Sequence, residues 1–248
     1  MDVTLLVLTA SACLGVGLLI GWTGVAGFLL PMFFAACWTL EISQVLAICF
    51  LCFAVSGVIG SLNYKRAGNL PLRPALYLSA GSLLGALLGA MLNQYIPAET
   101  VKLLLYAVVL LSGSSILLRK EKKDAPAAMP VPRFFPLAAL GLVTGLICAL
   151  SGAGGPVLVM PLLVVLGFPA HAAVGVALFD SIFIALPAVG VYWMQGAPPL
   201  GVLALCAAAH AVGVLVGSGT ARYVPGPLLK KVVGVCSVAI ALYMLLLR

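Results

Sequence analysis

The stretch "SGAGGP", residues 151–156, interrupts an apolar run that reads "GLICAL" before it and "VLVMPLLVVLG" after it. Glycine and proline are the weakest helix formers. A helix that stops inside a bilayer exposes backbone N–H and C=O groups that lipid cannot satisfy, so such a break is tolerated only where the backbone is buried in protein or lines a wet cavity. The stretch therefore predicts an interrupted helix whose interruption serves a function.

The composition around this stretch predicts a polytopic membrane protein. Of the 248 residues, 64% are hydrophobic and 8% are charged, which is too few charges for a soluble domain of this size. Many apolar runs have about the length that crosses a hydrocarbon core about 30 Å thick. The N-terminal run carries Asp2 where a signal peptide would carry basic residues, so no cleaved signal is expected. The expected apolar segments are 3–38, 42–64, 74–95, 100–118, 136–167, 170–194, 199–221 and 228–247.

The formal net charge of +7 comes from basic residues in short segments between apolar runs. Such clusters are topology signals and contacts with anionic lipid, so no nucleic-acid partner is expected. All three clusters become cytoplasmic if the run 136–167 enters and leaves the membrane on one face, which satisfies the positive-inside rule best. The clusters are Lys65, Arg66 and Arg73; Arg119, Lys120, Lys122, Lys123 and Arg133; and Arg222, Lys230 and Lys231.

The two halves of the chain match each other at a constant offset of 128 residues, without a gap. The matches keep Gly, Pro, Tyr and Lys in register, which apolar composition alone does not produce. A duplicated unit of four segments is therefore expected. The aligned pairs are "GLLIGWTGVAG" (17–27) with "GLICALSGAGG" (145–155), "AGNLPL" (67–72) with "QGAPPL" (195–200), "GSLLGALLG" (81–89) with "AHAVGVLVG" (209–217), and "YIPAETVK" (95–102) with "YVPGPLLK" (223–230).

Charge pattern and duplication together predict an all-α membrane protein built from two inverted repeats, residues 1–118 and 136–248. A cytoplasmic linker, residues 119–135, joins them. Each repeat is expected to start with a broken or re-entrant helical hairpin that turns at its Gly-rich stretch. The run 5–38 has 34 residues, about 51 Å as a straight helix, which is too long for one crossing and too short for two. A hairpin that penetrates partway is therefore expected.

The two Gly-rich breaks form the candidate substrate site. At each break a second half-helix begins, and its first N–H groups carry the positive end of the helix dipole. Glycine lets a ligand approach those groups closely, and a hydroxyl at each break adds a donor. Two such ends facing each other would bind a small anion. The candidate residues are Thr23, Gly24, Gly27, Ser151, Gly152, Gly154 and Gly155.

Two polar residues within the apolar segments are candidates for proton coupling. Asp180 lies deep inside the segment 170–194, where a carboxyl group is a functional candidate by default; pairing with a buried hydroxyl, amide or histidine is the structural alternative. His210, in "AAAHAVG", either lines the same cavity or donates a hydrogen bond between helices. Tyr64 and Tyr192 lie near segment ends, where tyrosine commonly anchors a helix at the membrane interface.

Other patterns predict packing. GxxxG patterns at Gly81-Gly85-Gly89 and Gly213-Gly217 favour close contact between helices. The seven cysteines lie in apolar segments and lack the spacing of a zinc or redox site, so they are expected to be small buried hydrophobes. No metal site or other cofactor is expected. No nucleophile–base arrangement is present in the sequence, so an enzyme is not expected.

The paired motifs "GLLIGWTGVAGFLLPMF" and "GLICALSGAGGPVLVMPLLVVLG", with "AHAAVGVALFDSI" after the second, resemble those of the TauE/SafE family, the sulfite exporter group. The resemblance covers nearly the whole chain. It implies a multi-pass transporter of the bacterial inner membrane that moves sulfur-containing anions. Its hairpin motifs map onto Gly24, Gly27, Pro31, Gly152, Gly154, Gly155 and Pro161. Where the family often carries a "GTS"-like cluster, this chain has "GVALFD" (175–180).

The expected function is therefore secondary transport of a small anion, such as sulfite, thiosulfate or an organosulfonate, with protons as a candidate coupling ion. The alternative is a cation or metal-ion transporter centred on Asp180 and His210, although clustered ligands would be expected for a metal. The expected partners are the anion and membrane lipid, and a second copy of the chain, in a homodimer, is a further candidate.

Overall fold

The computed structural model describes residues 3–24, 26–97, 99–101, 103, 106–107, 110–111, 114, 133–221, 235, 238 and 242. Every element formed within these residues is a helix. The expected segments 100–118 and 228–247 and the linker 119–135 lie mostly outside the described residues. The elements are α1 (Val3–Thr23), η1 (Ala26–Phe28), α2 (Leu29–Cys37), α3 (Ile42–Arg66), α4 (Leu72–Asn93), α6 (Phe134–Ser151), α7 (Gly155–Val165), α8 (Ala170–Gln195) and α9 (Leu200–Thr220).

Six of these helices, α1, α3, α4, α6, α8 and α9, are long and apolar enough to cross a membrane. The prediction of an all-α, multi-pass membrane protein is confirmed. The sequence predicts hairpins that penetrate the membrane only partway, but the first helix of each hairpin is longer than such a hairpin requires. α1 has 21 residues and α6 has 18, about 31 and 27 Å, so each first arm is nearly as long as the hydrocarbon core. Only the return arms α2 and α7 are short, with 9 and 11 residues.

Both first arms end in the same way. The Gly24 N–H donates to the Ile20 carbonyl at 2.8 Å, and the Gly152 N–H donates to the Cys148 carbonyl at 2.9 Å. Both glycines have φ of 72°, the left-handed conformation that commonly ends a helix. The prediction that the helices stop at the two Gly-rich stretches is confirmed, because a helix cannot continue through this conformation.

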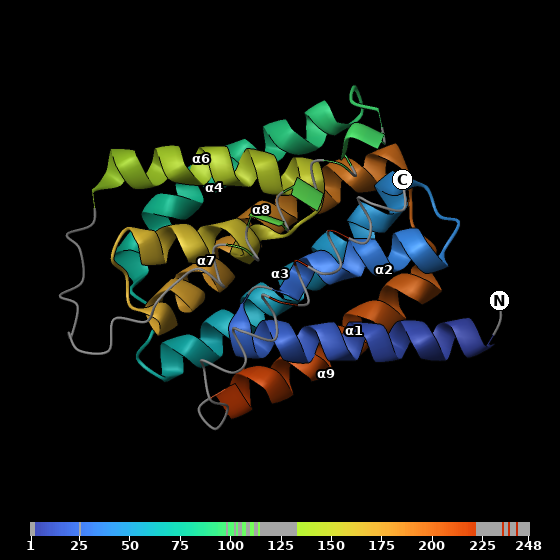
Figure 1. Ribbon diagram of the computed structural model, residues 1–248, viewed down its shortest axis with the longest axis horizontal. Coiled ribbons are helices and arrows are strands. Elements are labelled where there is room, and N and C mark those ends of the chain that lie inside the picture. Colours follow the sequence, from blue (N-terminus) through green and yellow to red (C-terminus); the bar gives the residue numbers. More distant parts are fainter. Residues whose placement is uncertain are drawn as a thin grey trace.

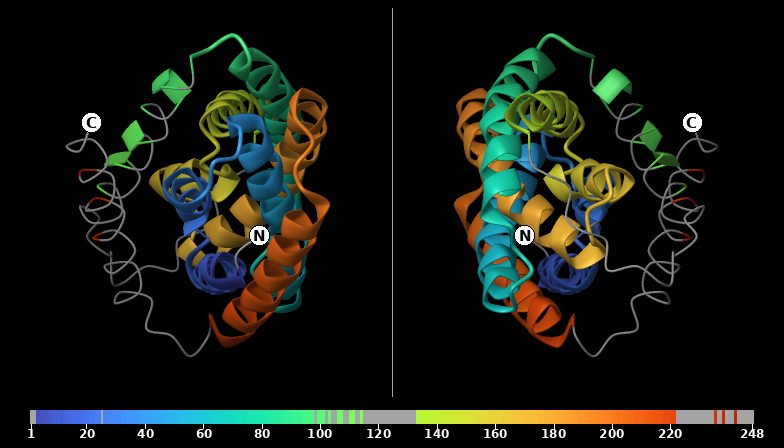
Figure 2. Two further views of the ribbon diagram at one scale, coloured as in Figure 1. Left: turned by 90° about the vertical axis from the view of Figure 1, so that its right-hand side faces the viewer. Right: turned by 90° about the vertical axis from the view of Figure 1, so that its left-hand side faces the viewer.

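The long helices form pairs, and the pair of α3 and α8 is the central one. α3 and α8 run antiparallel, with Gly57 of α3 against Ile182 of α8 and Gly60 against Leu178. α1 lies along one edge of the bundle and α6 along the opposite edge, and the return arms α2 and α7 lie between them (Figures 1 and 2). The breaks in the two hairpins are thereby held beside the central pair.

Glycine contacts fix the direction of the two outer pairs. A Cβ on Gly81, Gly85 or Gly89 of α4 would overlap the carbonyl oxygens of Ala138, Leu142 and Leu146 of α6, respectively. The residue numbers rise together along both helices, so α4 and α6 are parallel. The GxxxG prediction of a contact face is confirmed here, since only a glycine lets the two backbones come this close.

The same contacts recur between α9 and α1. A Cβ on Gly213 would overlap the Leu14 carbonyl oxygen, and one on Gly217 would overlap that of Leu18. Shifting the residue numbers by 128 converts the contacts of Gly85 and Gly89 into these two. α1 and α9 are therefore also parallel, and each hairpin packs against a helix from the other half of the chain.

Three side chains lie elsewhere than expected from the sequence. Tyr64 and Tyr192 are buried, with 6% and 0% exposure, and the Tyr192 hydroxyl donates to the Ala149 carbonyl at 2.7 Å. They therefore lie inside the bundle and not at the membrane interface. Cys37 is exposed, whereas the other described cysteines are buried, because it is the last residue of the short arm α2.

Candidate functional site

The tips of the two hairpins lie against each other. A Cβ on Gly27 would lie 3.4 Å from the Ala153 carbonyl oxygen. A small apolar cluster joins Phe28 and Met32 of the first hairpin with Ala153 and Val157 of the second. The two breaks, 126 residues apart in the chain when measured from Gly27 to Ala153, therefore form one region in the folded protein.

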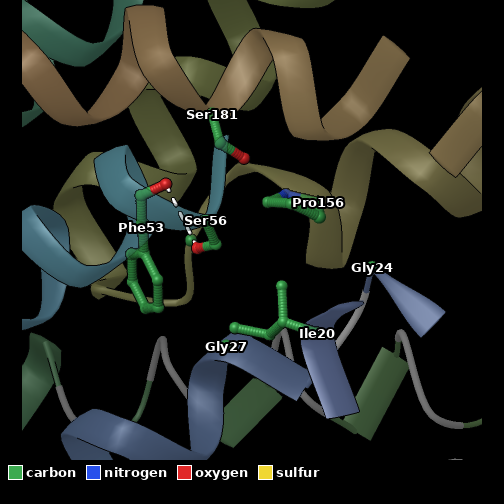
Figure 3. Close-up of a pocket in the computed structure, with 8 residues that line it drawn as sticks. Ile20, Gly24, Gly27, Phe53, Ser56, Pro156 and Ser181 are labelled. Atoms are coloured by element: carbon green, nitrogen blue, oxygen red, sulfur yellow. Dashed lines mark hydrogen bonds between the residues drawn. The ribbon is translucent and has the colours of Figure 1, made fainter. Parts of the chain in front are cut away.

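A small cavity lies between the tips and the central helices (Figure 3). In this conformation it has room for about one water molecule. Ser56 of α3 and Ser181 of α8 point toward it, and Ile20 closes it from the side of α1. Its lining is Ile20, Gly24, Gly27, Phe53, Ser56, Gly154, Pro156 and Ser181.

The seven candidate residues of the substrate site divide into those at the cavity and those behind it. Gly24, Gly27 and Gly154 line the cavity. Gly155 is next to it, since a Cβ there would lie 3.3 Å from the Ser181 hydroxyl oxygen. Gly152 instead faces Leu46 of α3.

The two predicted hydroxyl groups lie behind the glycines, at the last residues of α1 and α6. The Thr23 hydroxyl donates to the Leu19 carbonyl at 2.7 Å. The Ser151 hydroxyl oxygen accepts from the Ala153 N–H at 3.4 Å. Both side chains are buried, and in this conformation they shape the tips and do not face the cavity.

The sequence interpretation missed the wall of the cavity formed by Phe53, Ser56 and Ser181. Ser181 follows Asp180 directly, and Ser56 is a small polar residue in the middle of an apolar segment. Polarity inside a membrane span was the available signal. This signal singles out Asp180 and His210, but it applies equally to the serine hydroxyls in the middle of α3 and α8.

Among the described residues that line the cavity, none carries a charged side chain. The Ser181 hydroxyl donates to the Ala177 carbonyl at 2.9 Å, and the Ser56 hydroxyl donates to the Cys52 carbonyl at 2.9 Å. Carbonyls within a helix already accept the N–H of residue i+4, so a bound anion can draw either hydroxyl proton toward itself at little loss. The chemistry available is neutral hydrogen-bond donation, without a fixed counter-charge.

His210 lies one hydrogen bond away from this cavity. It is fully buried, with Nδ1 at 3.2 Å from the Cys13 carbonyl oxygen and Nε2 at 3.2 Å from the Ser56 hydroxyl oxygen. A carbonyl oxygen only accepts, so Nδ1 carries a proton. When the imidazole is neutral, Nε2 is an acceptor that the Ser56 hydroxyl can use in place of the Cys52 carbonyl, and when the imidazole is protonated, Nε2 donates to Ser56. The thiols of Cys13, Cys52 and Cys206 lie together beside this ring.

Asp180 does not line the cavity and faces α4 instead. It is fully buried, and its Oδ2 accepts from the Ser82 hydroxyl of α4 at 3.0 Å. Neither its Oδ1 nor the neighbouring Ser79 hydroxyl has a hydrogen-bond partner among the described residues. Asp180 and His210 share no hydrogen-bond partner there, so the folded chain does not bring the two coupling candidates into one site.

Metal ligands are not gathered in the described part of the chain. No group of three or more His, Cys, Asp or Glu side chains is placed there so that it could hold a metal ion. The alternative of a metal transporter centred on Asp180 and His210 therefore lacks a shared coordination site within those residues.

The comparisons with known proteins agree with the helical architecture. No solved structure matches the chain significantly. A protein from Bacillus subtilis (strain 168) described as "Probable membrane transporter protein YdhB" is 23% identical over 224 residues, which cover 88% of this chain and 91% of that protein. The family model described as "Sulfite exporter TauE/SafE" matches residues 8–244. The chain therefore belongs to the TauE/SafE family of sulfite exporter-like membrane transporters.

Proposed function

We propose that the chain transports a small sulfur-containing anion, such as sulfite, thiosulfate or an organosulfonate, which binds between the tips of the two hairpins. The observation that carries this proposal is the cavity into which both breaks open, with Gly24 and Gly27 from one hairpin and Gly154 from the other. Glycine leaves backbone N–H groups accessible, and an N-terminal helix end favours negative charge. The family supports the general class of substrate.

The absence of charge from the cavity lining suits transport better than tight storage. An anion held only by neutral donors, here the backbone of the tips with Ser56 and Ser181, binds less strongly than one paired with Arg or Lys. The cavity has room for about one water molecule, so the anion requires the tips to separate. Binding and release are thereby tied to a movement of the hairpins.

We also propose that the chain consists of two inverted repeats, residues 1–118 and 136–248, joined by the linker 119–135. The helix contacts support this, because the pairs Gly85–Leu142 and Gly89–Leu146 become Gly213–Leu14 and Gly217–Leu18 under the offset of 128. The opposite directions of α1 and α6 in Figure 1 support it further. In inverted repeats the substrate commonly lies where broken helices meet.

Transport in liposomes tests the proposed function. Reconstituted protein should move radiolabelled sulfite or thiosulfate, or sulfoacetate as a model sulfonate, at least several-fold faster than empty liposomes. Nickel and cobalt, assayed in parallel, should give no flux above the background. Metal flux without flux of any of the three sulfur compounds would contradict the proposal and favour the metal-transport alternative.

For proton coupling we propose His210 in preference to Asp180, because His210 alone contacts the cavity lining. When Nε2 takes up a proton it donates to Ser56, and the Ser56 hydroxyl must then donate elsewhere, to a backbone carbonyl or to an anion in the cavity. Protonation also places a positive charge near the anion. Uptake of a proton and binding of the anion therefore favour each other.

Substitution of His210 should remove the pH dependence of transport. His210→Gln keeps a polar side chain of similar size but cannot be protonated, so the ratio of transport rates between about pH 5.5 and about pH 8 should approach one. Asp180→Asn is the matched variant at a residue that does not line the cavity, and it should keep the wild-type ratio. If Asp180→Asn loses the pH dependence and His210→Gln keeps it, the assignment is reversed.

A further inference from the structure

Each hairpin tip is held to a helix of the other half by one hydrogen bond. The Asn93 side-chain amide, at the end of α4, donates to the Leu150 carbonyl at 2.9 Å. The Trp22 indole N–H donates to the Thr220 hydroxyl oxygen, at the end of α9, at 2.8 Å. We call these two bonds the α4–α6 clasp and the α1–α9 clasp. Leu150 and Trp22 each precede the last residue of their helix.

The clasps occupy corresponding places in the two halves. Under the offset of 128, Trp22 corresponds to Leu150, and Thr220 corresponds to the residue before Asn93. In α4 the contacts with α6 follow a spacing of four residues, from Gly81 through Gly85 and Gly89 to Asn93. In α6 the last turn therefore lies beyond the closest glycine contacts, whereas in α1 the hydrogen bond of Trp22 lies directly after Gly21, where a Cβ would overlap the backbone of Ser218.

The two clasps lie toward opposite ends of the molecule. Because α4 and α6 are parallel, Arg73 and Arg133, near their first residues, share one end, which we call the basic end. Asn93 lies at the other end of α4. Thr220 ends α9, and the Asn63 amide donates to Ser218 of α9 at 2.7 Å close to Lys65, so the α1–α9 clasp lies toward the basic end.

An open pocket lies beside the α4–α6 clasp and Asn93 forms part of its wall. The pocket has a volume of about 370 Å³, within the size range of sites for small molecules. Among the described residues, its polar lining consists of amide and hydroxyl groups, without a basic side chain. Its lining is Ile42, Ser43, Asn93, Gln94, Ile96 and Gln195.

We propose that the two clasps are the gates of the transport pathway and that this pocket is its outer mouth, where an anion is held by neutral amide donors before it reaches the cavity. The proposal rests on the proposed function. By the positive-inside rule the basic end is cytoplasmic, so the α4–α6 clasp is the outer gate and the α1–α9 clasp the inner gate. Opening either one requires only the last turn of α6 or α1 to part from its neighbour.

Sided labelling of introduced cysteines tests this proposal without any substrate. Ser151→Cys reports on the outer gate and Thr23→Cys on the inner gate, since both residues are buried next to a clasp. Cys37→Ser and Cys236→Ser form the background for both reporters. A membrane-impermeant methanethiosulfonate reagent is applied to right-side-out and to inside-out vesicles, and the rate of modification is measured.

Asn93→Leu should raise the labelling rate of Ser151→Cys from the outside about two- to tenfold, the shift expected from loss of one hydrogen bond. It should leave Thr23→Cys labelling from the inside unchanged or slower. Thr220→Val, which removes the acceptor but keeps the shape, should do the reverse. Thr220→Ser keeps the acceptor and Met91→Leu changes an exposed residue near Asn93 that does not line the pocket, so neither should alter the labelling of either reporter.

Two results would contradict the proposal that the clasps are gates. One is an equal rise of labelling at both reporters and from both sides, which would show a generally loosened fold. The other is no change in either clasp variant. The labelling experiment contains no anion to be transported, so it tests the gates independently of the substrate. If the labelling is as expected but the liposomes show no anion flux, only the proposed substrate is contradicted.

Discussion

Gly85→Ala is expected to destabilise the folded protein by about 3 kcal/mol or more, at or above the upper end of the usual effect of overpacking. A Cβ at this position would overlap the carbonyl oxygen of Leu142. Backbone atoms cannot turn aside as a flexible side chain does, so α4 and α6 must separate along their whole contact. In a membrane that contact is maintained largely by close packing, because lipid offers an equally apolar surface.

Gly190→Ala provides the control for this prediction, because a Cβ there has no neighbour within 4 Å. Removing a glycine from a helix interior without a new contact is favourable by about 0.5–1 kcal/mol, so this variant should be as stable as the wild type or slightly more stable. Thermal unfolding in detergent, followed by size-exclusion chromatography, measures both variants. Equal midpoints for Gly85→Ala and Gly190→Ala would contradict the close contact between α4 and α6.

The corresponding substitution in the other half, Gly213→Ala, gives an independent comparison. Its Cβ would overlap the carbonyl oxygen of Leu14, the residue that corresponds to Leu142. A loss of stability similar to that of Gly85→Ala is therefore expected. Similar losses of stability in the two variants would support the proposed repeat by an energetic measurement, in addition to the alignment of the two halves of the sequence.

The parts of the fold that the sequence predicted are those that depend on local chemistry. Glycines at 24 and 152 end the helices there because their backbone adopts φ of 72°, and no distant contact is needed to specify this. The GxxxG faces follow from the same local signal. The offset of 128 relates the glycine contacts of α4 with α6 to those of α9 with α1.

Other features depend on packing between distant segments and could not be read from the sequence. Whether Ser56 faces lipid or the cavity is decided by the rotation of α3 against the hairpin tips. Tyr192 has the composition of an interface anchor but is buried, with its hydroxyl bonded to the Ala149 carbonyl. Asp180 and Ser181 are adjacent in the chain, yet they face different neighbours, α4 and the cavity, since neighbouring residues on a helix point about 100° apart.

This separation of Asp180 from Ser181 changes the interpretation of the polar residues. A lone carboxyl group in a membrane span suggested the centre of a site. The Asp180 carboxyl group instead accepts a hydrogen bond from Ser82 of α4 and lies near Ser79 of the same helix. His210, for which the sequence left open a place in the cavity or a hydrogen bond between helices, connects through Ser56 to the space between the tips. Position relative to the breaks is therefore a better guide to the site than charge alone.

Gly154→Ala should reduce anion transport about tenfold or more while the protein still folds. Gly154 has φ of 79° and ψ of 147°, a backbone conformation that is essentially restricted to glycine and costs another residue about 1–3 kcal/mol. A Cβ would also lie 3.1 Å from the Phe53 ring, at the wall of the cavity. The tip must change its shape, and about 1.4 kcal/mol of lost anion binding corresponds to a factor of ten.

Gly68→Ala separates this effect from backbone strain in general. Gly68 also has a positive φ, 74°, but it lies in the loop between α3 and α4, where a Cβ has no neighbour within 4 Å. A substitution there introduces strain without touching the cavity, so transport per folded molecule should stay close to that of the wild type. Equal losses in the two variants would mean that strain alone reduces transport, and wild-type transport by Gly154→Ala would remove the second hairpin tip from the substrate site. A loss confined to Gly154→Ala is the result that a binding site between the tips requires.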